Sequence, residues 1–227
     1  MIAGVDGCSA GWMVAKDYGD GQLRISVVPS VADLIADQDL ELAVIDIPIG
    51  LLDRGVRAAD REARQLLGHR ASCVFNAPIR PVLAATDYSQ ANEIGRSVEG
   101  KGCSKQGFAL VPKIVEVDKL VRSGGVASGR IMEGHPEVSF ALMNGGTALS
   151  VSKHEADGRA ARVRLLATNL GCDAAGLAGA WPSSLTSDVL DSLAMLWTAR
   201  RVLSGSSSRI PKVPELDAFG IDAVITA

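Results

Sequence analysis

The first fifty residues alternate between apolar and polar positions in a pattern that predicts four strands and one short helix. Apolar residues recur at every second position, or in unbroken runs, where strands are expected, and glycine-containing turns separate the first three strands. The predicted strands cover residues 2–5, 11–16, 23–27 and 42–45. A helix over 31–35, capped at Ser30, lies between the third and fourth strands. The fourth strand is apolar throughout, which is typical of a strand buried on both faces beside a parallel neighbour.

This order of elements predicts the ribonuclease H-like fold. Three strands joined by hairpins precede a helix and a fourth strand, and in such a sheet the first and fourth strands lie side by side. Asp6 follows the first strand and Asp46 follows the fourth. We therefore expect the two carboxylates to lie within metal-bridging distance, although either one alone is equally typical of a turn or of a strand end in contact with water.

The rest of the chain predicts a helical insertion, a fifth strand and further helices. Helices are expected over 58–67, 88–98, 106–121 and 153–168, from about Glu137 to Met143, and from Thr186 or Ser187 onwards. A glycine-rich break is expected over 123–129, a fifth strand over 130–133 and a late edge strand over 221–225. We expect one α/β domain over 1–227, a mixed five-stranded sheet flanked by helices, with the insertion at about 54–125.

Composition and charge exclude several classes of protein. Apolar residues make up 47% of the chain, enough for a sizeable core, whereas the net charge of −3 gives no overall attraction for nucleic acid. To bind a polyanion, the protein would need a local basic patch and metal ions. The four cysteines form no C-x-x-C pair, so neither structural zinc nor a disulfide framework is indicated. No signal peptide is evident and no apolar stretch approaches the ~20 residues of a membrane helix, so we expect a cytoplasmic protein with no membrane partner.

Several separated motifs resemble a known family. They are Gly4-Val5-Asp6-Gly7-Cys8 with Gly11-Trp12, Ile45-Asp46-Ile47-Pro48-Ile49-Gly50-Leu51, and Glu133 with His135-Pro136-Glu137. Further matches continue to Trp197-Thr198-Ala199, so the resemblance spans roughly residues 2 to 200. The family is the domain-of-unknown-function family 429 (DUF429), described as predicted ribonuclease H-like nucleases. The resemblance implies that fold and a nuclease activity, which for the family is itself a prediction from the fold.

Five carboxylates are candidates for catalysis. They are Asp6, Asp46, Glu133, Asp188 and Asp191. Glu133 ends the fifth strand as Asp46 ends the fourth. In ribonuclease H-like enzymes a closing carboxylate comes from a helix near the C-terminus that packs beside the first strand, and both Asp188 and Asp191 lie on such a helix. Asp188 equally suits the first turn of that helix as a favourable charge, so the sequence leaves the choice between the two open.

The expected metal ligands are Asp6, Asp46, Glu133 and Asp191. Oxygen ligands without a histidine or thiolate cluster favour Mg²⁺ or Mn²⁺ over zinc. Two such ions ~4 Å apart would activate a water and stabilise the departing oxygen of a phosphodiester. His135 is a further candidate for metal ligation or proton transfer, but a histidine before proline more often fixes a loop by hydrogen bonding.

Six polar side chains are candidates for substrate binding. They are Arg70, Arg80, Lys105, Gln106, Lys113 and Lys153. The two arginines lie in a loop without helical period, where their planar donors suit either phosphate or surface ion pairs. Lys105 and Gln106 belong to a glycine-interrupted run that precedes a helix and suits either a phosphate cradle or a flexible connection. The other two lysines lie on charged helices, which either approach phosphate or face solvent.

The sequence thus indicates metal-dependent hydrolysis of phosphodiester bonds, with nucleic acid or a nucleotide as substrate. The enzymatic alternative is an ATP-binding phosphotransferase of the actin-like or sugar-kinase type, which also places an aspartate and glycines after its first strand. A chain of 227 residues is short for the two lobes of such enzymes. A non-catalytic module that binds nucleotide or nucleic acid is the second alternative, and the oligomeric state cannot be read from the sequence.

Overall fold

The computed structural model describes residues 1–124 and 129–227, and it confirms the predicted α/β fold with a mixed five-stranded sheet. The strands are β1 (Ile2–Cys8), β2 (Gly11–Asp17), β3 (Leu23–Val28), β4 (Leu42–Ile45) and β5 (Ile131–Glu133). Their order across the sheet is β3-β2-β1-β4-β5. The β1–β4 and β4–β5 pairs are parallel, and the β1–β2 and β2–β3 pairs are antiparallel. This is the ribonuclease H-like order expected from the strand pattern.

The parallel register aligns the carboxyl ends of three strands. Val5 is level with Ile45, and Ile45 is level with Glu133. The amide of Asp46 donates to the carbonyl of Val5 at 2.9 Å, so Asp6 and Asp46 follow one another at the same edge of the sheet. In open α/β sheets the crevice outside the carboxyl ends of the strands is where ligands bind.

One face of the sheet is crossed by α9 (Thr186–Leu203), which packs against β1, β2 and β4. The buried Leu193 belongs to the apolar cluster of this interface. Gly4 permits the close approach, because a Cβ at that position would lie 2.0 Å from the backbone nitrogen of Leu196. The tight contact brings Asp191 of α9 next to the end of β1.

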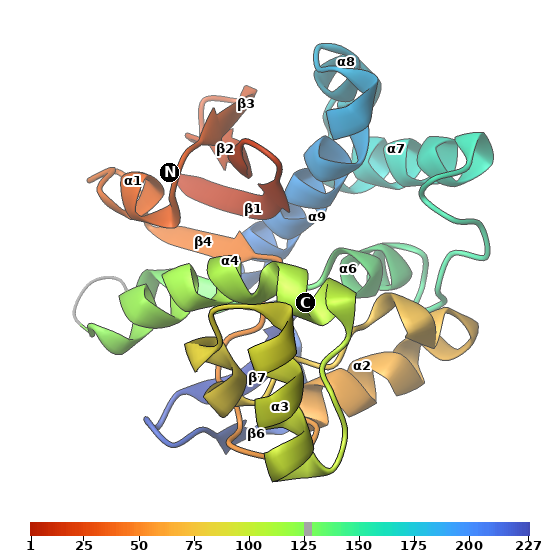
Figure 1. Ribbon diagram of the computed structural model, residues 1–227. Helices are drawn as coiled ribbons and strands as arrows, with labels where there is room; N and C mark the ends of the chain where they lie inside the picture. The colour runs from red at the N-terminus through yellow and green to blue at the C-terminus, as the bar shows by residue number, and fades with distance from the viewer. Residues whose placement is uncertain (125–128) are drawn as a thin grey trace.

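Helices on both faces give the molecule three layers (Figure 1). The helices that pack against α9 are α6 (Pro136–Met143), α7 (Ala156–Leu170) and α8 (Ala174–Gly179). Those on the opposite face are α1 (Val31–Ile35) and α4 (Lys105–Arg122). The fully buried Trp12 donates its indole N–H to the carboxylate of Glu116 on α4, and the ammonium of Lys113 lies 4.2 Å from its ring centre. These contacts fix the turn between β1 and β2 against α4.

Helices also occupy the segment between β4 and β5, where the sequence predicts an insertion. They are α2 (Ala58–Leu67), the 3-10 helices η1 (Gly68–Cys73) and η2 (Arg80–Ala84), α3 (Tyr88–Glu99) and α4. The predicted late strand is present as β7 (Asp222–Thr226), which pairs with β6 (Arg209–Leu216) in a separate two-stranded sheet. α2 packs against this small sheet, and Gly134 after β5 pairs with Thr226 of β7.

Of two predicted helix starts, the first is wrong and the second is confirmed. The helix expected from Lys153 begins at Ala156, because Glu155 is its N-cap, and Lys153 therefore lies in the preceding turn. Thr186 starts α9 but does not cap it, because the chain enters from the 3-10 helix η3 (Ser183–Leu185).

The predicted break over 123–129 lies partly outside the described residues. Within the described ranges, no helix is long and apolar enough to cross a membrane. The four cysteines are all free; Cys8 is buried and the other three are partly buried.

Candidate active site

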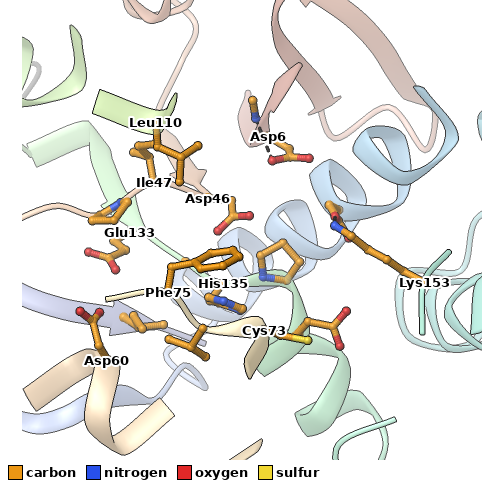
Figure 2. Close-up of a pocket in the computed structure, with 18 of the residues that line it drawn as sticks. Asp6, Asp46, Ile47, Asp60, Cys73, Phe75, Leu110, Glu133, His135 and Lys153 are labelled. Atoms are coloured by element: carbon orange, nitrogen blue, oxygen red, sulfur yellow. Dashed lines mark hydrogen bonds and ion pairs between the residues drawn. The ribbon is translucent and has the colours of Figure 1, made fainter. Parts of the chain in front are cut away.

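A cavity of about 500 Å³ lies at the carboxyl ends of β1, β4 and β5. Asp6, Asp46 and Glu133 line it from the strand ends, and Asp191 lines it from α9. Lys153 reaches it from the turn before α7 (Figure 2). The structure therefore brings four of the five predicted carboxylates to one cavity.

Three of these carboxylates act on one another electrostatically. Asp6 is 9% exposed and Asp191 is 1% exposed, whereas Asp46 is partly exposed. Burial, and then the charges of Asp191 and Asp46, raise the pKa of Asp6 well above its ordinary value. Loss of contact with water also raises the pKa of Asp46; nearby His135 lowers it and Asp191 raises it further. Asp6, Asp46 and Asp191 therefore form a mutually repelling group, called here the aspartate cluster.

Lys153 provides a cation for the aspartate cluster. Its ammonium donates to Oδ2 of Asp191. Burial acts to lower the pKa of Lys153, but the charges of Asp191, Asp6 and Asp46 raise it above its ordinary value overall. Oδ1 of Asp191 is buried and has no hydrogen-bond partner among the described residues. The lysine thus satisfies only one of the two oxygens of the most buried carboxylate of the cluster.

Asp188 stands apart from the cluster. It lies one turn before Asp191 on α9, is half-buried, and does not line the cavity. Burial and then the charge of Asp191 raise the pKa of Asp188. Between the two aspartates that the sequence left open, the structure therefore places Asp191 in the cavity.

Glu133 lines the cavity but is already engaged. Its two oxygens accept hydrogen bonds from the Nη1 and Nη2 atoms of Arg57, both at 2.8 Å, and Oε2 also accepts from the amide of Ile49 at 2.6 Å. Arg57 also pairs with the buried Asp60. The pKa of Glu133 is raised by burial, and Arg57 offsets part of that rise. Glu133 would have to leave Arg57 before it could act as a metal ligand.

Two further cavity residues have unsatisfied polar atoms. Nδ1 of His135 and Oε2 of Glu137 are buried, and neither has a hydrogen-bond partner in the part of the chain that the structure describes. The other oxygen of Glu137 accepts from the fully buried Arg162 at 2.6 Å. Buried polar atoms usually have partners, so the unpaired atoms around this cavity are consistent with a polar ligand.

The predicted substrate-binding residues separate into two groups. Arg70, Lys113 and Lys153 line the cavity, and Nε of Arg70 is buried with no hydrogen-bond partner within residues 1–124 and 129–227. Arg80 lies elsewhere and pairs with the carboxylates of Asp118 and Asp217. The remaining two residues are not at this cavity: Lys105 is exposed on the first turn of α4, and Gln106 lines a second cavity.

Sequence analysis missed three charged residues of the site. They are Arg57, Asp60 and Arg162, which hold Glu133 and Glu137 in place. Only the i, i+3 spacing of Arg57 and Asp60 at the start of a helix could have indicated their pairing. Nothing in the sequence marks Arg162, which lies among other arginines on a charged helix but is fully buried.

The aspartate cluster has the donor chemistry of a Mg²⁺ or Mn²⁺ site but not a finished geometry. Carboxylate oxygens are the ligands that these ions prefer, and Asp191 offers a buried oxygen without a partner. Among the described residues, however, no three His, Cys, Asp or Glu side chains stand close enough together to hold a metal ion as they are. A divalent cation would require the carboxylates to rotate toward it and Lys153 to withdraw from Asp191.

Asp6→Asn is expected to raise the midpoint of thermal unfolding of metal-free protein near neutral pH. The folded pKa of Asp6 lies above its ordinary value of 3.8, so its contribution to stability is fully present below that value and is lost as pH rises through the folded pKa. At a pH above the folded pKa, a pKa raised by one unit lowers the free energy of unfolding by about 1.4 kcal/mol. The charges facing Asp6 are those of Asp191, Asp46 and Asp188, opposed by Lys153.

Thermal unfolding in EDTA from about pH 4 to pH 8 measures this effect. The gap between Asp6→Asn and wild type should be small at the acid end and should widen toward neutral pH. A gap that stays constant across this range would contradict the raised pKa.

Comparison with known proteins identifies a family. A family model described as "Protein of unknown function (DUF429)" matches residues 4–216. No curated protein and no solved structure matches the chain. The matched range contains every residue of the aspartate cluster together with Glu133 and Lys153.

Proposed function

The chain belongs to the family matched as "Protein of unknown function (DUF429)", and we propose from its site that it is a divalent-cation-dependent hydrolase of phosphodiester bonds. The observation that carries this proposal is the aspartate cluster at the ends of two adjacent parallel strands and one crossing helix. Burial, and then repulsion within the cluster, raises the pKa of Asp6 and Asp46, and a bound cation would offset both effects. The substrate is a nucleic acid or a nucleotide.

Asp6, Asp46 and Asp191 are the residues that would hold Mg²⁺ or Mn²⁺. When bound, such an ion lowers the pKa of a water and stabilises charge on the departing oxygen of the phosphodiester. Glu133 serves instead to hold Arg57 and, through it, the loop at Ile49. This assignment needs no nucleophile from a side chain.

The other cavity residues bind the phosphate and move protons. Arg70 and Lys113 place positive charge around the cavity, and the unpaired Nε of Arg70 offers a donor to a phosphate oxygen. His135 lies beside Asp46, where it can accept a proton from the attacking water or donate one to the leaving group. Lys153 keeps Asp191 paired when no divalent cation is present.

Lys153→Met is expected to lower the unfolding midpoint of metal-free protein and to enlarge the rise that Mn²⁺ produces. Methionine keeps an apolar stem but leaves the buried Asp191 without its cation, which costs about 1–3 kcal/mol. Mn²⁺ then replaces the lost charge without having to displace an ammonium group. Thermal unfolding with EDTA or Mn²⁺ measures both effects.

Lys105→Met is the matched control, because Lys105 is an exposed lysine that does not line the cavity. Lys105→Met should change neither the unfolding midpoint of metal-free protein nor the rise in midpoint that Mn²⁺ produces. If Lys153→Met responded to Mn²⁺ no more than wild type does, Lys153 would not be occupying a cation position.

Hydrolysis assays on purified protein test the proposed function. Labelled single-stranded DNA, single-stranded RNA, duplex DNA, RNA–DNA hybrid and ATP are each incubated with Mg²⁺, Mn²⁺ or EDTA. The proposal expects cleavage of at least one nucleic acid with either cation and none in EDTA. Transfer or release of the terminal phosphate of ATP, without cleavage of nucleic acid, would instead indicate a phosphotransferase.

A further inference from the structure

Phe75 stands between the candidate active site and a second cavity. Its side chain is 45% exposed, and it lines both the first cavity and a neighbouring one of about 360 Å³. In Figure 2 its ring points into the first cavity, toward Asp46. The second cavity lies between the segment that follows Phe75, α3 and the start of α4. A single aromatic ring therefore connects the two hollows.

The backbone on both sides of Phe75 is held by side chains of α2. The guanidinium group of Arg64 donates twice to the carbonyl of Val74, at 2.9 and 2.8 Å. Oδ2 of Asp60 accepts from the amide of Ala77 at 2.9 Å. Asp60 also pairs with Arg57, so this segment is tied to the buried ion pairs of the active site. The exposed ring is thus presented by a fixed segment.

The other phenylalanines of the chain already have ring partners. Phe108 packs against Tyr88, Phe140 lies beneath the guanidinium of Arg162, and Phe219 lies between Arg80 and Arg122. Among the described residues, Phe75 alone of the four has neither an aromatic nor a cationic partner on its ring. An exposed, fixed and unpartnered aromatic face is what an unpaired base requires for stacking.

We propose that Phe75 is a stacking platform for an unpaired base and that the second cavity receives the nucleoside next to the scissile phosphate. This inference rests on the proposed hydrolysis and names its substrate class, a single strand or a strand with unpaired nucleotides. The amides of Asn76 and Gln106 at the second cavity carry the donors and acceptors that base edges need, and Lys101 adds a positive charge for the backbone. A base held in a duplex is stacked on its neighbours and cannot enter.

The test is fluorescence anisotropy of a labelled ten-nucleotide single strand, as DNA and as RNA, and of the matching DNA duplex. Wild type, Phe75→Leu, Phe75→Trp and Leu203→Ala are compared in EDTA and with Ca²⁺. Phe75→Leu keeps an apolar side chain but removes the ring, and Phe75→Trp restores an aromatic face. Leu203→Ala is the control, because Leu203 is 48% exposed at the end of α9 and lines neither cavity.

The inference expects Phe75→Leu to weaken single-strand binding about tenfold or more, Phe75→Trp to retain it, and the control to bind as wild type does. The duplex should bind more weakly and be insensitive to Phe75. Single-strand binding by Phe75→Leu that equals wild type, duplex binding as tight as that of the single strand, or no binding by wild type would overturn it.

Cleavage by wild type with Mg²⁺ or Mn²⁺ is scored separately. Absence of cleavage alongside Phe75-dependent binding refutes hydrolysis and leaves a binding site for single strands. If wild type cleaves but Phe75→Leu binds the single strand as tightly as wild type does, the stacking platform is refuted and the proposed hydrolysis is retained.

Discussion

Asp191→Asn is expected to reduce the rate of phosphodiester hydrolysis by at least roughly a thousandfold, or about 4 kcal/mol of transition-state stabilisation. Asp191 is almost fully buried, its Oδ1 has no hydrogen-bond partner among the residues that the structure describes, and its charge raises the pKa of both Asp6 and Asp46. Asp191 therefore lines the part of the cavity where a bound cation would be most favoured. The measurement is the initial rate of cleavage, in Mn²⁺, of the strand that wild type cleaves fastest.

Asp188→Asn is the matched control for this variant. It makes the same chemical change one helical turn away on α9, where the side chain is half-buried and outside the cavity. The expected loss is at most about tenfold, through weaker long-range electrostatics. If Asp188→Asn lost as much activity as Asp191→Asn, or Asp191→Asn retained wild-type activity, the assignment of Asp191 would be wrong. Unfolding midpoints in EDTA that lie well above the assay temperature for both variants exclude loss of fold as the cause.

Arg57→Met is expected to lower the free energy of unfolding by about 3–5 kcal/mol. Arg57 is 3% exposed and pairs with two carboxylates, Glu133 and Asp60, that are themselves 5% and 1% exposed. Removing the guanidinium leaves two buried charges without a counter-ion, which costs far more than losing a surface pair. Urea unfolding followed by circular dichroism measures the change.

Arg61→Met is the control, on the helix α2 that Arg57 directly precedes. Arg61 pairs with Glu215, but the two side chains are 54% and 39% exposed, so the expected loss is under about 1 kcal/mol. Adding Glu133→Gln to Arg57→Met should recover part of the lost stability, because one of the stranded charges is then removed. A loss of less than about 1 kcal/mol for Arg57→Met would show that this buried cluster does not stabilise the fold.

The strand order and the placement of Asp6, Asp46 and Asp191 were accessible from the sequence, for a physical reason. Apolar runs that form buried strands are a local signal, and a carboxylate directly after such a run lies at the end of its strand. Strands that follow a helical crossover lie parallel, so their ends meet at one edge. Asp191 borders the apolar stripe of α9, which the same helical periodicity reveals.

The partners of these carboxylates were not accessible in the same way. Lys153 reaches Asp191 only because α7 starts at Ala156, three residues later than its charged sequence suggests. Glu133 resembles Asp46 in its place at a strand end, yet Arg57 from 76 residues away in the chain takes both of its oxygens. Such ion pairs depend on how distant elements pack, and a single sequence carries no local signal for them.

The most direct test of the central claim is calorimetric titration of Mn²⁺ into wild type, Asp6→Asn and Glu133→Gln. If the aspartate cluster is the cation site, wild type binds Mn²⁺, and Asp6→Asn binds it with an affinity at least about tenfold weaker. Glu133→Gln should bind as wild type does, because Arg57 already occupies that carboxylate. No Mn²⁺ binding by wild type, or equal affinity in Asp6→Asn, would contradict the claim.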